Sequence, residues 1–112
     1  MKRVTYADTA LLMGDDAADT LLEYARVLTQ SAGVDSVTLR CLSTDGDAVD
    51  ASFLIHGHAA LLVESTHSDI AAPENTDAVA ELRDRIQRVR QPASAVQDDS
   101  LWSSTEDDLG EI

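Results

Sequence analysis

The chain has 112 residues, of which 44% are hydrophobic and only 4% aromatic, and its formal net charge is −13 at pH 7. This length fits one domain with an aliphatic core, and the charge disfavours direct binding to nucleic acid or to anionic membranes. No apolar run approaches the ~20 residues that span a bilayer. Because no signal-peptide stretch follows the first residues, we expect a cytoplasmic protein.

The first elements predicted along the chain are a short strand and a helix. Residues 3–6 alternate in polarity, which predicts a strand at the edge of a sheet. Apolar side chains then recur at helical spacing over residues 16–32. Asp15 or Asp16 is expected to cap the start of this helix. Gly33 is expected to end it in the left-handed conformation.

The stretch 37–65 is predicted to be a meander of three strands, because apolar and polar residues alternate strictly along it. The odd-numbered positions carry most of the β-branched and large apolar side chains. We therefore expect that face to form the core. Its residues are Val37, Leu39, Cys41, Val49, Ala51, Phe53, Ile55, Ala59, Leu61 and Val63.

The first turn of the meander sets the register of its first two strands. Residues 44–46 suit a three-residue loop with Gly46 in the left-handed conformation, where the missing Cβ removes a steric cost. This loop places Cys41 opposite Val49. A two-residue Asp-Gly loop is rejected, because it would pair odd with even positions and turn one apolar set away from the core.

The second turn is expected at residues 56–58, again as a three-residue loop, which would set Phe53 opposite Leu61. Both registers together predict a row on the opposite face of the sheet that joins Arg40, Asp50 and Glu64. Such an exposed row contributes little, about 0–1 kcal/mol. It serves as a check on the register.

A second helix is predicted to begin at Asn75 or Thr76 and to end near residue 91, before Pro92. The fold class is therefore α+β: a three- or four-stranded, mostly antiparallel sheet with two helices, in the order β-α-β-β-β-α. Residues 1–91 are expected to form a single domain, and residues 92–112 an acidic tail.

The tail holds six acidic and no basic residues, a composition typical of a segment that is disordered unless it docks. Leu101, Trp102 and Leu109 stand among these charges, and tryptophan is a favoured anchor at interfaces. The tail is expected to dock on its own domain, to bind another protein or to remain solvated without a partner. The candidate contact residues on the even face of the meander are Leu42, Leu54 and Leu62.

Catalytic and metal sites find little support in the sequence. His56 and His58 could hold zinc with a third ligand such as Glu64, but two solvated turn histidines are the simpler interpretation. Cys41 points into the predicted core and is expected to behave as an apolar residue. Because no phosphate-binding loop and no nucleophile beside a base is found, we expect no enzyme, no catalytic residue and no cofactor.

The function expected from these observations is a small, acidic, non-enzymatic interaction module, of the adaptor, immunity or inhibitor type, that binds a basic protein partner. One alternative is an inhibitor that imitates nucleic-acid phosphates to occupy a DNA- or RNA-binding protein. The other is a small metal-binding protein that uses the turn histidines. A homodimer is compatible with all three.

Overall fold

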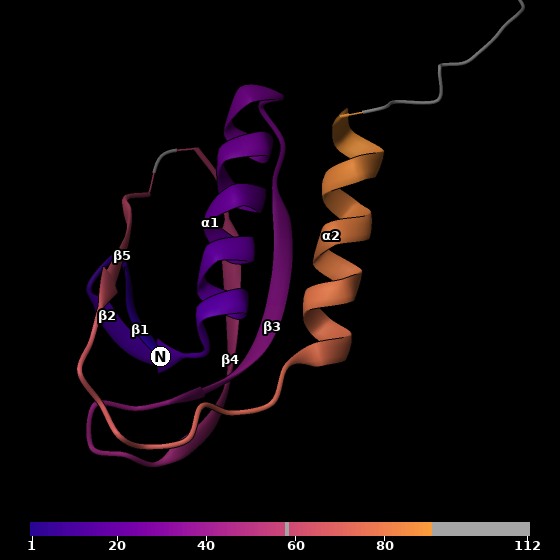
Figure 1. Ribbon diagram of the computed structural model, residues 1–112. Coiled ribbons are helices and arrows are strands. Elements are labelled where there is room, and N and C mark those ends of the chain that lie inside the picture. The colour runs from indigo at the N-terminus through magenta and orange to yellow at the C-terminus, as the bar shows by residue number, and fades with distance from the viewer. Residues whose placement is uncertain (58, 91–112) are drawn as a thin grey trace, which may run out of the picture.

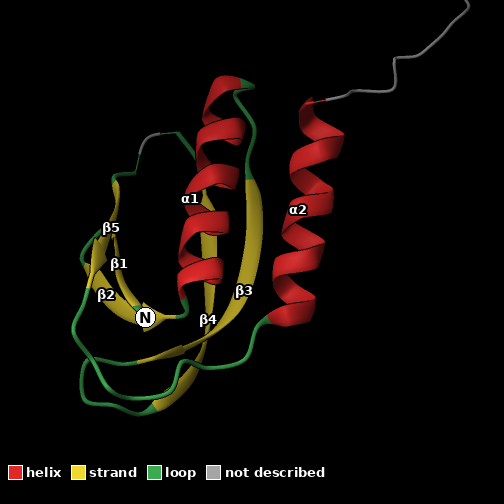
Figure 2. Ribbon diagram, in the orientation of Figure 1, coloured by secondary structure: helices red, strands yellow, loops and turns green. Residues whose placement is uncertain are grey.

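The computed structural model describes residues 1–57 and 59–90, which form five strands and two helices (Figures 1 and 2). The elements in chain order are β1 (Lys2–Tyr6), β2 (Thr9–Met13), α1 (Asp15–Gln30), β3 (Asp35–Leu42), β4 (Ala48–Ile55), β5 (Leu61–Ser65) and α2 (Thr76–Arg90). The class is α+β, as predicted, but the sheet has five strands rather than three or four. Residues 92–112, the predicted tail, lie outside the described residues.

The sheet is antiparallel and has the strand order β4-β3-β2-β1-β5. It divides into two parts, because β2 meets β3 only where Leu12 lies opposite Leu42. Strands β1, β2 and β5 form one part, and the long hairpin of β3 and β4 forms the other. Figure 2 shows the two parts side by side, with α1 in front of β4 and roughly aligned with it, and with α2 next to β3.

The hairpin of β3 and β4 confirms the first predicted register. Cys41 lies opposite Val49, and Arg40 lies opposite Asp50, with 3.2 Å between Nε and Oδ1. In the loop, the Gly46 amide donates to the Ser43 carbonyl oxygen at 2.9 Å, and the φ angle of Gly46 is 93°. The three-residue loop therefore forms as expected, because only glycine adopts this conformation without a steric penalty.

The predicted second turn of the meander is wrong. β5 pairs with β1 at the other edge of the sheet, so Leu61 lies opposite Tyr6 rather than Phe53. The Glu64 carboxylate consequently faces Arg3, 3.7 Å from its Nε, and does not join the row of Arg40 and Asp50. Periodicity places a side chain on a face but does not choose the neighbouring strand, and the apolar face of β5 fits β1 equally well.

The first strand is also placed differently from the prediction. β1 is not at the sheet edge, because it lies between β2 and β5. A two-residue turn joins β1 to β2, with Tyr6 opposite Thr9 and Ala7 at a φ of 55°. Alanine is an uncommon residue in the left-handed region, and the turn lacks the Asn-Gly or Asp-Gly signal by which sequence reveals such hairpins.

The core lies between the sheet and the two helices. The odd-numbered side chains of β3 and β4 reach it as predicted: Leu39, Cys41 and Ile55 are at most 1% exposed, and Phe53 is 6% exposed. From α1 and α2 it receives Ala17, Ala18, Leu21, Tyr24, Val27, Leu28, Val79, Leu82 and Ile86. Each large aliphatic side chain buried in this way stabilises the fold by about 1.5–3 kcal/mol.

The caps of α1 differ from those predicted. Gly14 occupies the N-cap position without a side-chain hydrogen bond. Asp15 and Asp16 lie in the first turn, where a negative charge interacts favourably with the helix dipole and stabilises the helix. At the other end Ala32, not Gly33, is left-handed, with a φ of 55°. The Gly33 amide donates to the Leu28 carbonyl oxygen at 2.8 Å, the bond that closes a Schellman motif.

The pairing of β5 with β1 can be tested by a disulfide. Arg3 and Glu64 are direct partners in the antiparallel ladder, where Cα atoms are about 4.5–5.5 Å apart, within the range that a disulfide accepts. The variant with both Arg3→Cys and Glu64→Cys should therefore oxidise to an intramolecular disulfide, detectable by thiol labelling and intact mass. Asp50→Cys with Glu64→Cys serves as the control for the rejected meander, and its preferential oxidation would refute the observed strand order.

Candidate functional site

Three polar side chains meet where α1, β3 and α2 adjoin, and we call Tyr24, Asp35 and Arg85 the junction. Tyr24 is 3% exposed, and its hydroxyl donates a hydrogen bond to the Asp35 carboxylate. Arg85 Nη1 donates to Asp35 Oδ2 at 2.9 Å and to the Ser36 carbonyl oxygen at 3.1 Å. The junction therefore ties both helices to the start of β3.

The electrostatics of the junction follow from these contacts. Burial, followed by the hydrogen bond to Asp35, raises the pKa of Tyr24 to about 12. The hydrogen bond from Tyr24 is the main cause that lowers the pKa of Asp35, with help from the Ser36 amide and the Arg85 guanidinium. The neutral phenol and the charged carboxylate are thus the stable forms over the physiological range.

The free edge of β3 is covered by side chains of the segment that contains α2. Because the Ser43 amide pairs with the Asp47 carbonyl oxygen, the odd positions of β3 bond to β4 and the even ones face the opposite edge. There Asn75 Oδ1 accepts from the Arg40 amide and Asn75 Nδ2 donates to the Arg40 carbonyl oxygen, both at 2.8 Å. Asn75 imitates the peptide of a neighbouring strand and fixes the start of α2 on this edge.

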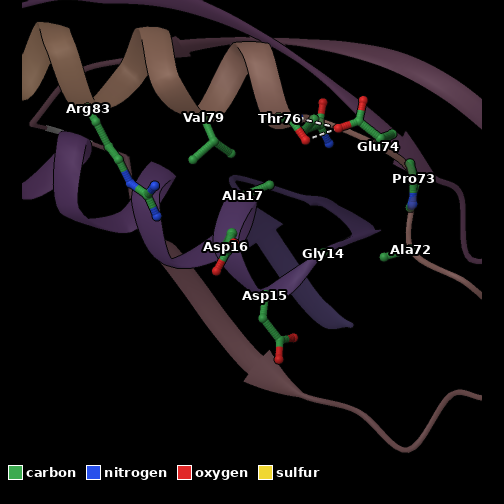
Figure 3. Close-up of a pocket in the computed structure, with 11 residues that line it drawn as sticks. Gly14, Asp15, Asp16, Ala17, Ala72, Pro73, Glu74, Thr76, Val79 and Arg83 are labelled. Carbon is green, nitrogen blue, oxygen red and sulfur yellow. Dashed lines mark hydrogen bonds between the residues drawn. The ribbon is translucent and has the colours of Figure 1, made fainter.

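A cleft of about 510 Å³ separates the first turns of the two helices (Figure 3). Asp15 and Asp16 line it from α1, and Glu74 and Arg83 from the segment of α2. The Glu74 carboxylate accepts hydrogen bonds from the Thr76 amide, at 2.9 Å, and from the Thr76 hydroxyl. Glu74 thereby caps α2, which gives it a structural role.

Ion pairs leave an uneven surface charge. Seven of the eight basic side chains pair with a carboxylate of the described residues, Arg83 being the exception. Eight carboxylates of the same part of the chain have no such cationic partner. They are Asp8, Asp16, Asp45, Asp47, Asp69, Glu74, Asp77 and Asp84.

Most of these carboxylates gather at one end of the molecule. Figure 1 shows both helices starting at this end, beside the turn between β3 and β4 and the connection from β5 to α2. Those segments carry six of the unmatched carboxylates, and we call this set the acidic end. Its members are Asp16, Asp45, Asp47, Asp69, Glu74 and Asp77. The acidic end thus presents six carboxylates without an ion-pair partner among the described residues, and Arg83 is a cation that lines the same cleft as Asp16 and Glu74.

The predicted apolar contact residues are only partly at the surface. Leu54 on β4 and Leu62 on β5 are 59% and 52% exposed, whereas Leu42 is 8% exposed and therefore unavailable to a partner. β4 and β5 are the two edge strands of the sheet. Leu101, Trp102 and Leu109 lie outside the described residues.

A second cleft, of about 420 Å³, opens between the two edge strands and the carboxyl-terminal half of α1; we call it the seam cleft. The Tyr6 hydroxyl donates to the Leu54 carbonyl oxygen, and the Tyr6 ring packs edge-on against Phe53, with 6.0 Å between centroids. Tyr6, at the end of β1, thus forms one wall of the cleft, and its side chain reaches the edge strand β4. The lining residues are Tyr6, Leu22, Ala25, Arg26, Thr29, Gln30, Ile55, His56, Ala59 and Leu61.

The structure bears on the thiol prediction fully and on the zinc hypothesis only in part. The zinc hypothesis rests on His56 and His58, and His58 lies outside the described residues. Within residues 1–57 and 59–90, no three His, Cys, Asp or Glu side chains are grouped so that they could hold a metal ion. Cys41 is buried as predicted, and burial raises the pKa of its thiol to about 11, which keeps it in the poorly reactive protonated form.

The described part of the chain thus forms an α+β domain with a split five-stranded antiparallel sheet and two helices, and its surface clefts include the one between the helix starts and the seam cleft. Comparison with protein-family models, curated proteins and solved structures found no match to this chain. Neither described helix has the length and apolar character needed to cross a membrane.

The sequence interpretation missed the junction and the seam cleft. Tyr24 and Asp35 are 11 positions apart, and Asp35 and Arg85 are 50 apart, so no local pattern connects them. Asn75 was expected only as a helix cap, while its amide in fact bonds to Arg40. Asp35 begins β3 two residues after Gly33, but nothing in its local sequence identifies its partners.

The junction predicts a pH-dependent loss of stability on Asp35→Asn. Because hydrogen bonds to a charged group are worth about 1.5–3 kcal/mol and this carboxylate is one third exposed, we expect a cost of about 1–2 kcal/mol at pH 7. The folded pKa of Asp35 is lowered, so its contribution is present above the unfolded value near 3.8 and is lost as pH falls through the folded pKa.

Urea unfolding at pH 7 and at successively lower pH measures this difference. The gap between wild type and Asp35→Asn should close in acid. Asp84→Asn, on the same helix as Arg85 but without an ion-pair partner among the described residues, should cost less than about 0.5 kcal/mol at every pH. An equal cost for both variants at pH 7 would contradict the role assigned to the junction.

Proposed function

We propose that the protein is a small, acidic, non-enzymatic interaction module, of the adaptor, immunity or inhibitor type, that binds a basic protein partner at the acidic end. The observation that carries the proposal is the unequal pairing of charges. Seven of eight cations are neutralised within the domain, while six unmatched carboxylates gather at one end. Such a surface attracts a basic partner and accelerates its association.

Another role, the stabilisation of helix starts, explains part of this charge. Asp16 and Asp77 lie in the first turns of α1 and α2, where a carboxylate stabilises a helix by about 0.3–1 kcal/mol. Asp45 and Asp47 in the turn between β3 and β4 have no such role, since the turn is held by backbone bonds and by the Ser43 hydroxyl. These two carboxylates are therefore the most informative ones to change.

A second candidate function is an inhibitor that imitates nucleic-acid phosphates. The gathering of carboxylates at one end, rather than an even spread over the surface, favours it. It differs from the first candidate in one respect: nucleic acid would compete for the partner. Addition of duplex DNA or of RNA to the purified complex separates the two.

The proposal predicts that Asp45→Asn with Asp47→Asn weakens binding of the basic partner and lowers its dependence on salt. The control is Asp8→Asn with Asp84→Asn, which removes the same charge outside the acidic end. Immobilised wild type and both variants are exposed to host lysate at low and high salt, and proteins retained by wild type are purified and titrated calorimetrically. Loss of two surface charges should reduce affinity about tenfold, or about 1.4 kcal/mol.

The comparison of the two variants decides the result. Retention by wild type and by the control, with loss in the variant of the turn, supports the proposal. Equal weakening in both double variants would mean that only total charge matters. A partner whose binding is unchanged in both variants and insensitive to salt would show that the acidic end takes no part.

A further inference from the structure

The seam cleft differs in charge from the other clefts of the domain. Four other surface clefts on the described part of the chain each have at least one carboxylate among their lining residues. The seam cleft has none, and its rim carries the Arg26 guanidinium and the His56 imidazole. On a protein with a net charge of −13, this is a place where an acidic segment meets little repulsion.

The walls of the seam cleft are mostly apolar. Leu22 is 41% exposed, and Ala25, Ala59 and Leu61 lie partly buried around it. A volume of about 420 Å³ is within the range of about 300–1,000 Å³ typical of ligand sites, which is enough for one large aromatic side chain. Leu22 therefore stays exposed unless an apolar group covers it.

We propose that the seam cleft is the docking site of the chain's own carboxyl-terminal segment around Leu101 and Trp102. This segment holds the chain's single tryptophan, and Asp98 and Asp99 precede it. Burying a tryptophan removes about 150–250 Å² of surface from water. The two aspartates make the segment poorly suited to the acidic end. The rim of the seam cleft suits them better, because it has no carboxylate among its described lining residues and carries Arg26, whose charge is shared with Glu23.

The course of the chain makes this contact possible. α1 and α2 start at the same end and run side by side, so α2 ends near the carboxyl-terminal half of α1 (Figure 1). Arg90, the last residue of α2, forms an ion pair with Glu23. Glu23 also pairs with Arg26, at 2.6 Å between Oε2 and Nη2, and Arg26 lines the cleft.

The distance is well within reach. The 11 residues from Arg90 to Leu101 span up to about 36 Å when extended, whereas a helix with its side chains is about 10–12 Å wide. The segment can therefore cross α1 and enter the cleft without strain. The outer leucines Leu54 and Leu62 are the competing docking place, and the experiment below distinguishes the two.

Trp102 is the only tryptophan, so its fluorescence reports directly on its own environment in the full chain. The proposal predicts emission shifted to shorter wavelength than in the urea-unfolded chain and weak quenching by acrylamide, a neutral quencher. Leu22→Asp should move the emission to the unfolded value and raise the quenching constant severalfold. Leu22→Lys should have a smaller effect, because a cation attracts the aspartates beside the tryptophan. Leu54→Asp, the control, should change neither quantity.

A second measurement avoids any change in the domain itself. Trp102→Ala in the full chain should shift the methyl resonances of Leu22 and Leu61 and leave that of Leu54 unchanged. Wild-type emission equal to that of the unfolded chain would overturn the proposal. So would a response to Leu54→Asp but not to Leu22→Asp. An emission shift that grows with protein concentration, together with a dimer mass in sedimentation, would assign the cleft to a second copy instead.

Discussion

The single bridge between β2 and β3, where Leu12 lies opposite Leu42, is the constraint on which the rest of the structure depends. A longer ladder would have covered the edge of β3 with another strand. Instead, backbone groups of its even positions bond to side chains of the α2 segment, which covers a strand edge that would otherwise be open to pairing with another chain. The Asn75 side chain bonds to the backbone amide and carbonyl oxygen of Arg40, and Arg85 donates to the Ser36 carbonyl oxygen.

The replacement of a neighbouring strand by side chains of the α2 segment explains the position of α2. The helix lies beside β3 because its preceding residue and its third turn supply the missing hydrogen bonds, while Val79, Leu82 and Ile86 fill the core. Tyr24 connects α1 to the start of β3 by its hydrogen bond to Asp35. One short ladder thus has consequences for both helices.

The parts of the fold that sequence could predict are those with local signals. The hairpin of β3 and β4 has strict alternation and a glycine where the backbone needs one, and its register was predicted correctly. β5 has the same alternation, but its pairing partner depends on which apolar strand lies nearby. It pairs with β1 instead of β4. The hairpin of β1 and β2 has no recognisable turn signal in the sequence, because Ala7 stands where such turns usually have glycine or asparagine.

The candidate sites show the same limit. Alternation predicted correctly that Leu54 and Leu62 face outward, and it wrongly left Leu42 on the surface, since the pleat does not reveal what covers the end of a strand. The acidity of the chain was evident from composition alone. Its concentration at one end was not, because that depends on both helices starting beside the turn between β3 and β4.

Amide hydrogen exchange of Arg40 tests the central claim, that α2 takes the place of a strand at the edge of β3. The account predicts that the Arg40 amide is protected in wild type and exchanges much faster in Asn75→Ala, while the Val37 amide, which faces β4, remains protected in both. An Arg40 amide that exchanges at the same rate in wild type and in Asn75→Ala would contradict the account.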